Sequence, residues 1–146
     1  MRTPASIAKH PIHPMLVAIP IGLWILSFAC DLIRYFGGTS PNWGVVALYS
    51  LVGGIIGALL AALPGLIDLL SLRGGLRRIA LMHMGINLTV VALYVVNAWL
   101  RMRGTDTLAV LLSAVSIGLL LVSGWLGGKM VHVHGVGVVT PPDPVR

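Results

Sequence analysis

Four long apolar runs constrain this chain more than any other feature of its sequence. They cover approximately residues 15–36, 43–64, 79–100 and 107–128, and only the last turns of the first run carry charge, at Asp31 and Arg34. Each run can cross a hydrocarbon core of about 30 Å, which takes about 20 helical residues. Because lipid offers no hydrogen-bond partner to a peptide group, each run is predicted to form a membrane-spanning helix.

The composition agrees with a surface that faces lipid. Hydrophobic residues make up 57% of the 146 residues and charged residues only 10%, whereas a soluble domain carries about 25% charged residues. The length leaves room for one domain. The net charge of +6 is spread in short groups between the apolar runs, which argues against a nucleic-acid-binding protein. A single cysteine, Cys30, excludes an internal disulfide and a covalently attached c-type haem.

The segments between the runs are short and rich in turn residues. Glycine, proline and asparagine occupy residues 37–42, and Pro64-Gly65 is expected to end or kink the second helix. Short connections make neighbouring helices antiparallel. The sequence therefore predicts an all-α, up-down-up-down bundle of four membrane helices, preceded by a short N-terminal segment and followed by an extended C-terminal tail.

The distribution of lysine and arginine predicts the orientation of this bundle. The N-terminus, the second connection and the C-terminal tail share one side of the membrane, and this side holds seven basic residues against three on the other. The larger set is Arg2, Lys9, Arg73, Arg77, Arg78, Lys129 and Arg146, and the smaller is Arg34, Arg101 and Arg103. By the positive-inside rule, both termini are predicted to be cytoplasmic.

All five histidines fall on the predicted cytoplasmic side. His10 and His13 precede the first helix, His83 lies one turn into the third, and His132 and His134 follow the fourth. Interfacial histidines are often only amphipathic residues at the lipid headgroups, and this interpretation suits His132. His83 differs, because an ionisable residue inside an apolar helix is costly and usually faces the bundle interior.

The positions of His13 and His83 favour a haem site. Both belong to helices that should run parallel and diagonally across the bundle, so the two side chains are expected at the same depth in its interior. Two imidazoles that approach each other in this way can hold a haem iron inside a four-helix bundle. His10 and His134 are a second candidate pair nearer the surface, which gives one or two haems of b type.

Other residues near this face fit the haem hypothesis. Arg73, Arg77 and Arg78 lie where they would neutralise the haem propionates, as do Lys9 and Lys129. Asn87, one turn from His83, is placed either to hydrogen-bond a ligand ring or to pair between helices. Asp68 is placed either to accept a hydrogen bond from a ligand imidazole and so orient it, or to lie at the interface beside Arg73.

Two other functions are compatible with the same residues. His10, His13, His83 and His134 suit a bare zinc, iron, copper or nickel ion. A metal transporter usually needs polar groups across the whole bilayer, and the far half of each helix reads as almost purely aliphatic, with Asn97 as the main exception. The third alternative is a structural or accessory membrane subunit whose histidines do no chemistry.

At these positions the chain resembles the bacterial membrane family called domain of unknown function 2231, over nearly its whole length. The resemblance is carried by His10-Pro11-Ile12-His13-Pro14-Met15-Leu16-Val17 with Pro20-Ile21-Gly22, by Gly65-Leu66-Ile67-Asp68, by His83 and Asn87, and by Gly127-Gly128-Lys129 with His134-Gly135-Val136-Gly137-Val138. It implies a multi-pass protein of the bacterial inner membrane in which His10, His13, His83 and His134 belong to the shared pattern.

The resemblance also implies a role in electron transfer. Some relatives place this domain beside a Rieske iron–sulfur domain, which points to a redox partner of that type. We therefore expect a small b-type cytochrome rather than an enzyme acting on a substrate, since iron with two imidazole ligands has no open position. The protein is expected to be surrounded by lipid. The sequence is compatible with a homo-oligomer and does not determine the number of subunits.

Overall fold

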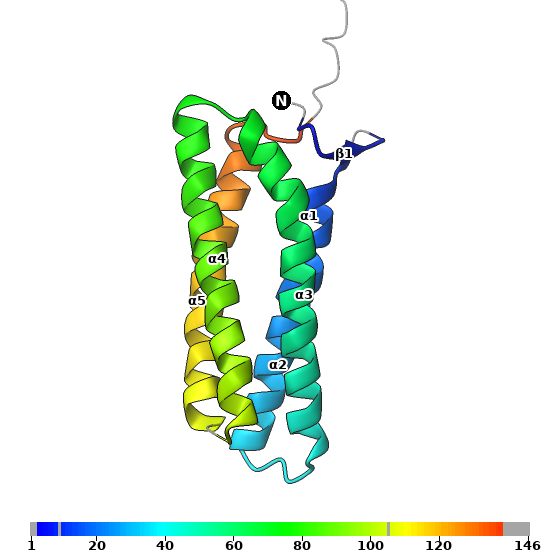
Figure 1. Ribbon diagram of the computed structural model, residues 1–146, viewed down its shortest axis with the longest axis vertical. Coiled ribbons are helices and arrows are strands. Elements are labelled where there is room, and N and C mark those ends of the chain that lie inside the picture. Colours follow the sequence, from blue (N-terminus) through cyan, green and yellow to red (C-terminus); the bar gives the residue numbers. More distant parts are fainter. Residues whose placement is uncertain (1–2, 9, 105, 139–146) are drawn as a thin grey trace, which may run out of the picture.

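Four long helices dominate the computed structural model, which describes residues 3–8, 10–104 and 106–138 (Figure 1). The elements in chain order are β1 (Ser6–Ile7), β2 (His10–Pro11), α1 (Ile12–Leu16), α2 (Ala18–Tyr35), α3 (Asn42–Ser71), α4 (Gly74–Met102) and α5 (Asp106–His132). The two short strands pair antiparallel. With α1 and α2 counted as one span, four helices are long and apolar enough to cross a membrane. The predicted all-α class with four membrane helices is confirmed.

The helices extend beyond the predicted runs at the end that carries the histidines. α3 continues to Ser71 through Pro64, where the sequence indicated an end or a kink, and α4 begins at Gly74 rather than at residue 79. Pro64 lacks an N–H, so one carbonyl of the preceding turn has no helical partner. Ending the helix there would leave several peptide groups unpaired at membrane depth, which costs more than losing one bond.

The first span is interrupted at Val17, between α1 and α2. Pro20 accounts for this break, because it offers no N–H to the carbonyl of Leu16 and its ring crowds that carbonyl. The chain direction is kept, since Val17 donates its backbone N–H to the carbonyl of His13. Pro14 lies in the first turn of α1, where a missing N–H has no helical partner to lose.

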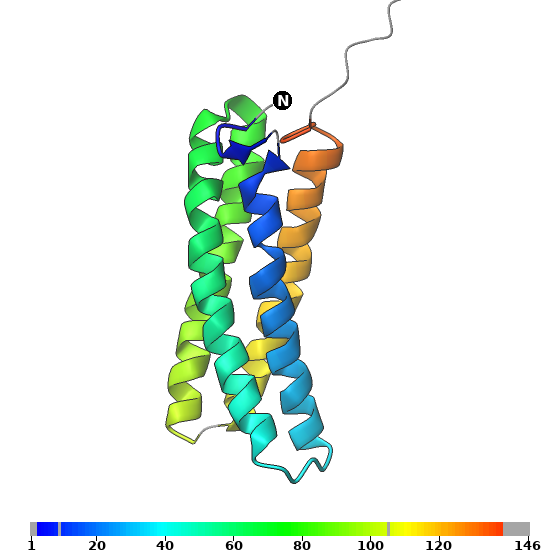
Figure 2. The ribbon, with the colours of Figure 1, turned by 90° about the vertical axis from the view of Figure 1, so that its right-hand side faces the viewer.

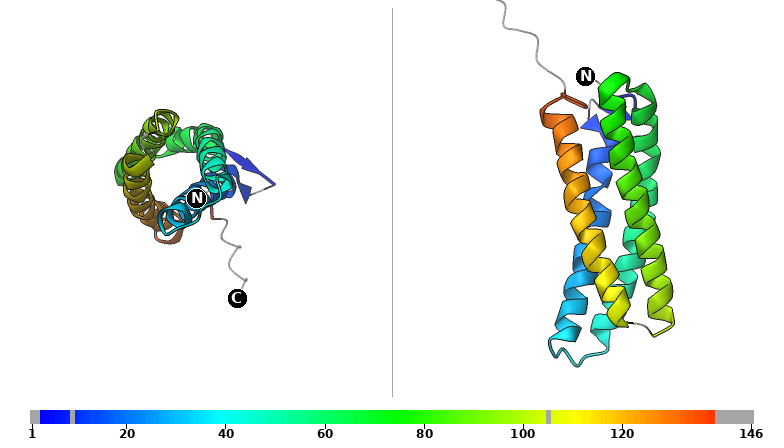
Figure 3. Two further views of the ribbon diagram at one scale, coloured as in Figure 1. Left: turned by 90° about the horizontal axis from the view of Figure 1, so that it is seen from below. Right: turned by 90° about the vertical axis from the view of Figure 1, so that its left-hand side faces the viewer.

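The helices form two antiparallel hairpins, α2 with α3 and α4 with α5, which surround a common axis (Figures 2 and 3). In the first hairpin, Trp24 Nε1 donates to the carbonyl of Leu51 at 3.2 Å, and a Cβ on Gly54 would lie 2.3 Å from the same indole nitrogen. The glycines of α3 therefore serve close packing against α2. The described chain ends and the α3–α4 connection lie at one end of the bundle (Figure 1).

The two hairpins repeat one another in three dimensions. Three pairs of residues that meet across the bundle, from the first span to α4, are each separated by 70 residues along the chain. The pairs are His13 with His83, Trp24 with Tyr94, and Asp31 with Arg101. Contacts inside the hairpins match as well: Ser27 donates to the carbonyl of Ala47 as Asn97 donates to that of Ala109. A pseudo-twofold axis along the bundle thus relates one hairpin to the other.

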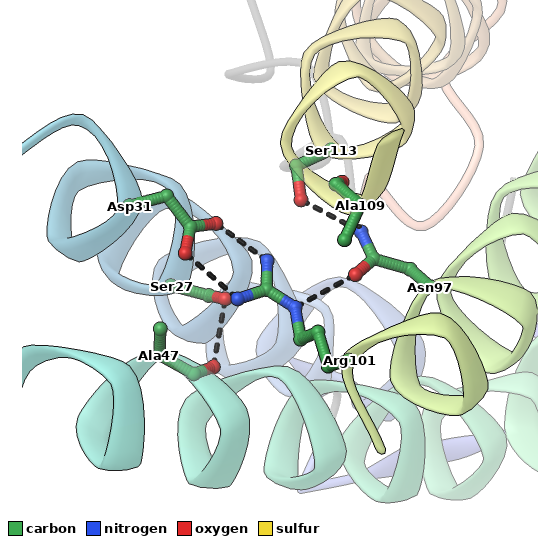
Figure 4. A network of polar contacts seen from close by, with 7 residues as sticks. All are labelled: Ser27, Asp31, Ala47, Asn97, Arg101, Ala109 and Ser113. Atoms are coloured by element: carbon green, nitrogen blue, oxygen red, sulfur yellow. Dashed lines mark hydrogen bonds and ion pairs between the residues drawn. The ribbon is translucent and has the colours of Figure 1, made fainter. Parts of the chain in front are cut away.

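A buried ion pair joins the hairpins at the end opposite the histidines (Figure 4). Arg101 donates to both carboxylate oxygens of Asp31, at 2.7 and 2.5 Å. Its Nε donates to Asn97 Oδ1 at 2.7 Å, and Asn97 donates in turn to Ser113 Oγ at 2.8 Å. The expectation that the far half of the bundle is almost purely aliphatic is wrong, because these polar groups, each paired with another, line its interior.

Replacing Arg101 with methionine tests how much this ion pair contributes to the free energy of unfolding. The change would leave the Asp31 carboxylate buried without a counter-charge, which typically costs about 3–5 kcal/mol of unfolding free energy. The measurement is thermal unfolding in detergent, followed by the loss of helical circular dichroism.

The matched control is Arg103→Met. Arg103 is exposed and lies over the Trp99 ring, 5.3 Å from its centroid, a contact worth about 0.5–1 kcal/mol at an exposed site. Equal losses in the two variants would show that the buried pair does not hold the hairpins together.

Candidate functional site: a histidine pair between the hairpins

Two of the five histidines meet at the end of the bundle that carries the chain ends. The ring centroids of His13 on α1 and His83 on α4 are 6.3 Å apart, and the ring planes are perpendicular, at 90°. Both residues are half-buried. One imidazole comes from each hairpin, at equivalent positions about the pseudo-twofold axis, so the pair lies on the boundary between the hairpins.

A backbone carbonyl of the neighbouring helix holds each imidazole. His13 Nδ1 lies 2.7 Å from the carbonyl oxygen of Ala61, and His83 Nδ1 lies 2.9 Å from that of Ser123. Because a carbonyl oxygen only accepts, we assign the ring proton to Nδ1 in both histidines. Each Nε2 then carries a lone pair, which is the state in which a neutral imidazole binds a metal ion.

A glycine leaves the space in which each ring lies. A Cβ on Gly65 would be 2.8 Å from His13 Nδ1, and a Cβ on Gly127 would be 3.4 Å from His83 Cε1. The two glycines occupy matching positions of α3 and α5. Sequence reasoning noted both glycines as parts of motifs, but their contact with the imidazoles depends on helix packing and is visible only in the structure.

Two further contacts belong to His83 alone. Ser123 Oγ lies 2.9 Å from its Nδ1, and Asn87 Nδ2 lies 3.1 Å from its Nε2 while also donating to its backbone carbonyl at 2.9 Å. The matching positions of the first hairpin are Ala61 and Val17, whose side chains have no hydrogen-bonding group. The two halves of the site therefore share a backbone arrangement and differ in side-chain chemistry.

The second predicted histidine pair lies in more exposed positions. His10 on β2 is exposed, with its Nδ1 2.9 Å from the carbonyl oxygen of Ala8. His134 is exposed in the segment after α5, where Gly137 packs close to Pro11 of β2. Within residues 3–8, 10–104 and 106–138, no group of three or more His, Cys, Asp or Glu side chains could hold a metal ion.

The basic residues predicted to face propionates lie near this end of the bundle. Arg73, Arg77 and Arg78 are exposed around the α3–α4 connection. Lys129 is half-buried, with its ammonium nitrogen 5.5 Å from the centroid of the Trp125 ring. Lys9 falls outside the described residues. The arginine side chains have the exposure needed to meet an anionic group at the membrane surface.

A hydrogen bond to Asp68 holds the N-terminal segment at the end of the bundle that carries the histidines. Asp68 Oδ1 accepts the backbone N–H of Ala5 at 2.9 Å, and both Thr3 and Ala5 are buried. Sequence reasoning considered this carboxylate as a partner for an imidazole. The structure gives it a peptide N–H instead, because the end of α3 meets the chain segment that precedes β1.

The fold and the site define a class: a helical membrane protein with four spans and a histidine pair enclosed between two matching hairpins. The chain belongs to the DUF2231 family of predicted membrane proteins, whose model matches residues 9–140. No curated protein and no solved structure matches the chain. The family thus establishes a membrane protein.

Alanine in place of Gly65 tests how tightly the His13 ring is confined. A Cβ at 2.8 Å from Nδ1 must displace the imidazole or the helix, so we expect Gly65→Ala to lower the unfolding free energy by about 1–3 kcal/mol. Gly127→Ala, with its Cβ at an ordinary contact distance of 3.4 Å, should cost less. Thermal unfolding in detergent provides the comparison.

Gly118→Ala is the matched control for these variants, because a Cβ at this exposed position of α5 meets nothing within 4 Å. It should leave stability unchanged or slightly raised, since alanine favours a helix over glycine by about 1 kcal/mol. If Gly65→Ala behaves like Gly118→Ala, the ring is not confined as described.

Proposed function

We propose that this protein is a small membrane cytochrome of b type, in which His13 and His83 would hold the haem iron. The observation that carries the proposal is the 6.3 Å separation of the two ring centroids. Two imidazoles that bind opposite sides of one metal ion, at about 2.0 Å each, have their centroids about 6 Å apart. The carbonyl contacts at both Nδ1 atoms support the proposal, because they direct the Nε2 lone pairs to the metal.

A two-ligand site favours haem over a bare metal ion. Zinc takes about three or four protein ligands, and the described part of the chain has no group of three or more candidate ligands. A haem iron needs only two ligands from the protein, since the macrocycle supplies the other four. The two ligands would come from different hairpins, and the hairpins contact each other less closely than the helices within each hairpin do.

A bound haem would supply one-electron chemistry. His13 and His83 would hold the iron, and Arg73, Arg77 and Arg78 at the same end would balance the charge of the propionates. With both ring nitrogens of each histidine engaged, neither imidazole is available as an acid or a base. This favours electron transfer over a substrate reaction, with a partner such as a Rieske-type iron–sulfur protein at the histidine end. A second haem on His10 and His134 stays a prediction.

The visible absorption spectrum of the protein tests this function. After expression with ample haem and purification in detergent, we expect a Soret band that shifts on reduction. His13→Ala and His83→Ala should each lower the haem content at least about tenfold, the scale expected for loss of a metal ligand or its support. His132→Ala, at an exposed position beyond the pair, is the control and should keep its haem.

Elemental analysis of the same samples separates the alternatives. A protein without a Soret band that carries a stoichiometric transition metal would support the bare-ion site. A protein with neither haem nor metal would support an accessory subunit whose histidines do no chemistry.

We further propose that the histidine end faces the cytoplasm of a bacterial cell, in the inner membrane. The exposed Arg73, Arg77 and Arg78 lie at this end together with both described chain ends (Figure 1), which agrees with the positive-inside rule. A green fluorescent protein fused to the C-terminus should therefore fluoresce, and alkaline phosphatase fused there should be inactive. Phosphatase inserted at Gly38, in the connection at the opposite end, is the control and should be active. The reverse pattern would place the site outside the cytoplasm.

A further inference from the structure

The partners of the two Nε2 atoms differ, although the positions of the two rings are equivalent. Asn87 Nδ2 lies 3.1 Å from His83 Nε2, whereas the described residues provide no hydrogen-bond donor to His13 Nε2. An imidazole nitrogen has one lone pair in the ring plane. His83 Nε2 can therefore accept from Asn87 or bind a metal ion, but it cannot do both.

The cost of leaving a metal ion is consequently different for the two histidines. If His83 releases the ion, its Nε2 regains the N–H of Asn87 while Nδ1 keeps the carbonyl and hydroxyl of Ser123. If His13 releases the ion, no described residue offers its Nε2 a donor that corresponds to Asn87, because the matching position is Val17. Release of His83 is the less costly of the two events.

Asn87 is also positioned so that binding and release of the metal disturb it little. Its amide donates to the backbone carbonyl of His83 at 2.9 Å in addition to contacting Nε2. When Nε2 binds the ion, the amide keeps this backbone hydrogen bond. His83 Nε2 would therefore have a partner in either arrangement.

We propose that, of the two histidines that would hold the iron, His13 would be the permanent ligand and His83 the exchangeable one, with Asn87 as the positioning residue that offers His83 Nε2 a second partner. This inference rests on the proposed haem function and adds a second class of ligand to it. The position that His83 would vacate lies between the hairpins, beside the half-buried His13. Carbon monoxide, a small neutral diatomic, is the laboratory probe for an open position on the iron.

The internal repeat of the chain provides a matched pair of variants. Val17 occupies the position of the first hairpin that corresponds to Asn87, so Asn87→Val removes the Nε2 partner that His13 lacks and keeps the Ser123 contacts at Nδ1 of His83. Thr89→Val is the control, because Thr89 is exposed on the same helix and its hydroxyl donates only to the carbonyl of Gly85. It removes one polar group of α4 without touching either histidine.

Carbon monoxide titration of the reduced, haem-loaded protein in detergent is the main test. The wild type should bind carbon monoxide, and Asn87→Val should lower its affinity about tenfold, since the net value of one hydrogen bond corresponds to about a factor of ten. Thr89→Val should match the wild type. Bound haem with the same carbon monoxide affinity in all three proteins would overturn this inference and leave the proposed function standing. A wild type that binds no haem would overturn both.

A second measurement does not depend on haem. Diethyl pyrocarbonate modifies the lone-pair nitrogen of neutral imidazole, and mass spectrometry of the apoprotein reports the rate at each histidine. Asn87→Val should raise the rate at His83 relative to the exposed His10, and Thr89→Val should not. An unchanged rate in Asn87→Val would show that Asn87 does not occupy His83 Nε2, and the inference would fall.

Discussion

In lipid, every backbone polar group must find its hydrogen-bond partner within the protein, and the rest of this structure depends on that requirement. Because of this requirement, the four spans are helical and α3 continues through Pro64 to Ser71. The requirement also governs the side chains: Trp24 and the two interior histidines all use backbone carbonyls of the neighbouring helix. The imidazoles are thus oriented by the same constraint that builds the helices, and the site needs no loop to shape it.

The residue pairs that meet at the two ends of the bundle differ in their chemistry. At one end the matching positions carry identical residues, His13 and His83, whose like chemistry suits a shared metal ion. At the other end they carry Asp31 and Arg101, whose opposite charges attract and fix the register of the first span against α4. Because both pairs have the same separation along the chain, an ion pair that sets this register also brings the histidines to the same depth.

The two hairpins differ in the side chains that contact the histidines, and these differences give the two rings different chemistry. The backbone places a carbonyl and a glycine beside each ring in the same way. Only the second hairpin adds Ser123 Oγ and Asn87 to this arrangement. A symmetric pair would hold a metal with two equal ligands, whereas this pair has one ligand with an alternative partner. In the proposed haem site, the contrast between Asn87 and Val17 would make one of the two ligands exchangeable.

The sequence by itself determined the four membrane spans and the gathering of the histidines at one end, because hydropathy over about 20 residues is a local property. Tertiary structure decided which polar groups meet. The distance from His13 to His83, the partner of Asp68, and the burial of Asp31 with Arg101 all depend on how helices distant in sequence rotate and slide against each other. The repeat of the two hairpins belongs here too, since most of its matching contacts are made by residues of different type, such as Ser27 and Asn97, and are visible only once the chain is packed.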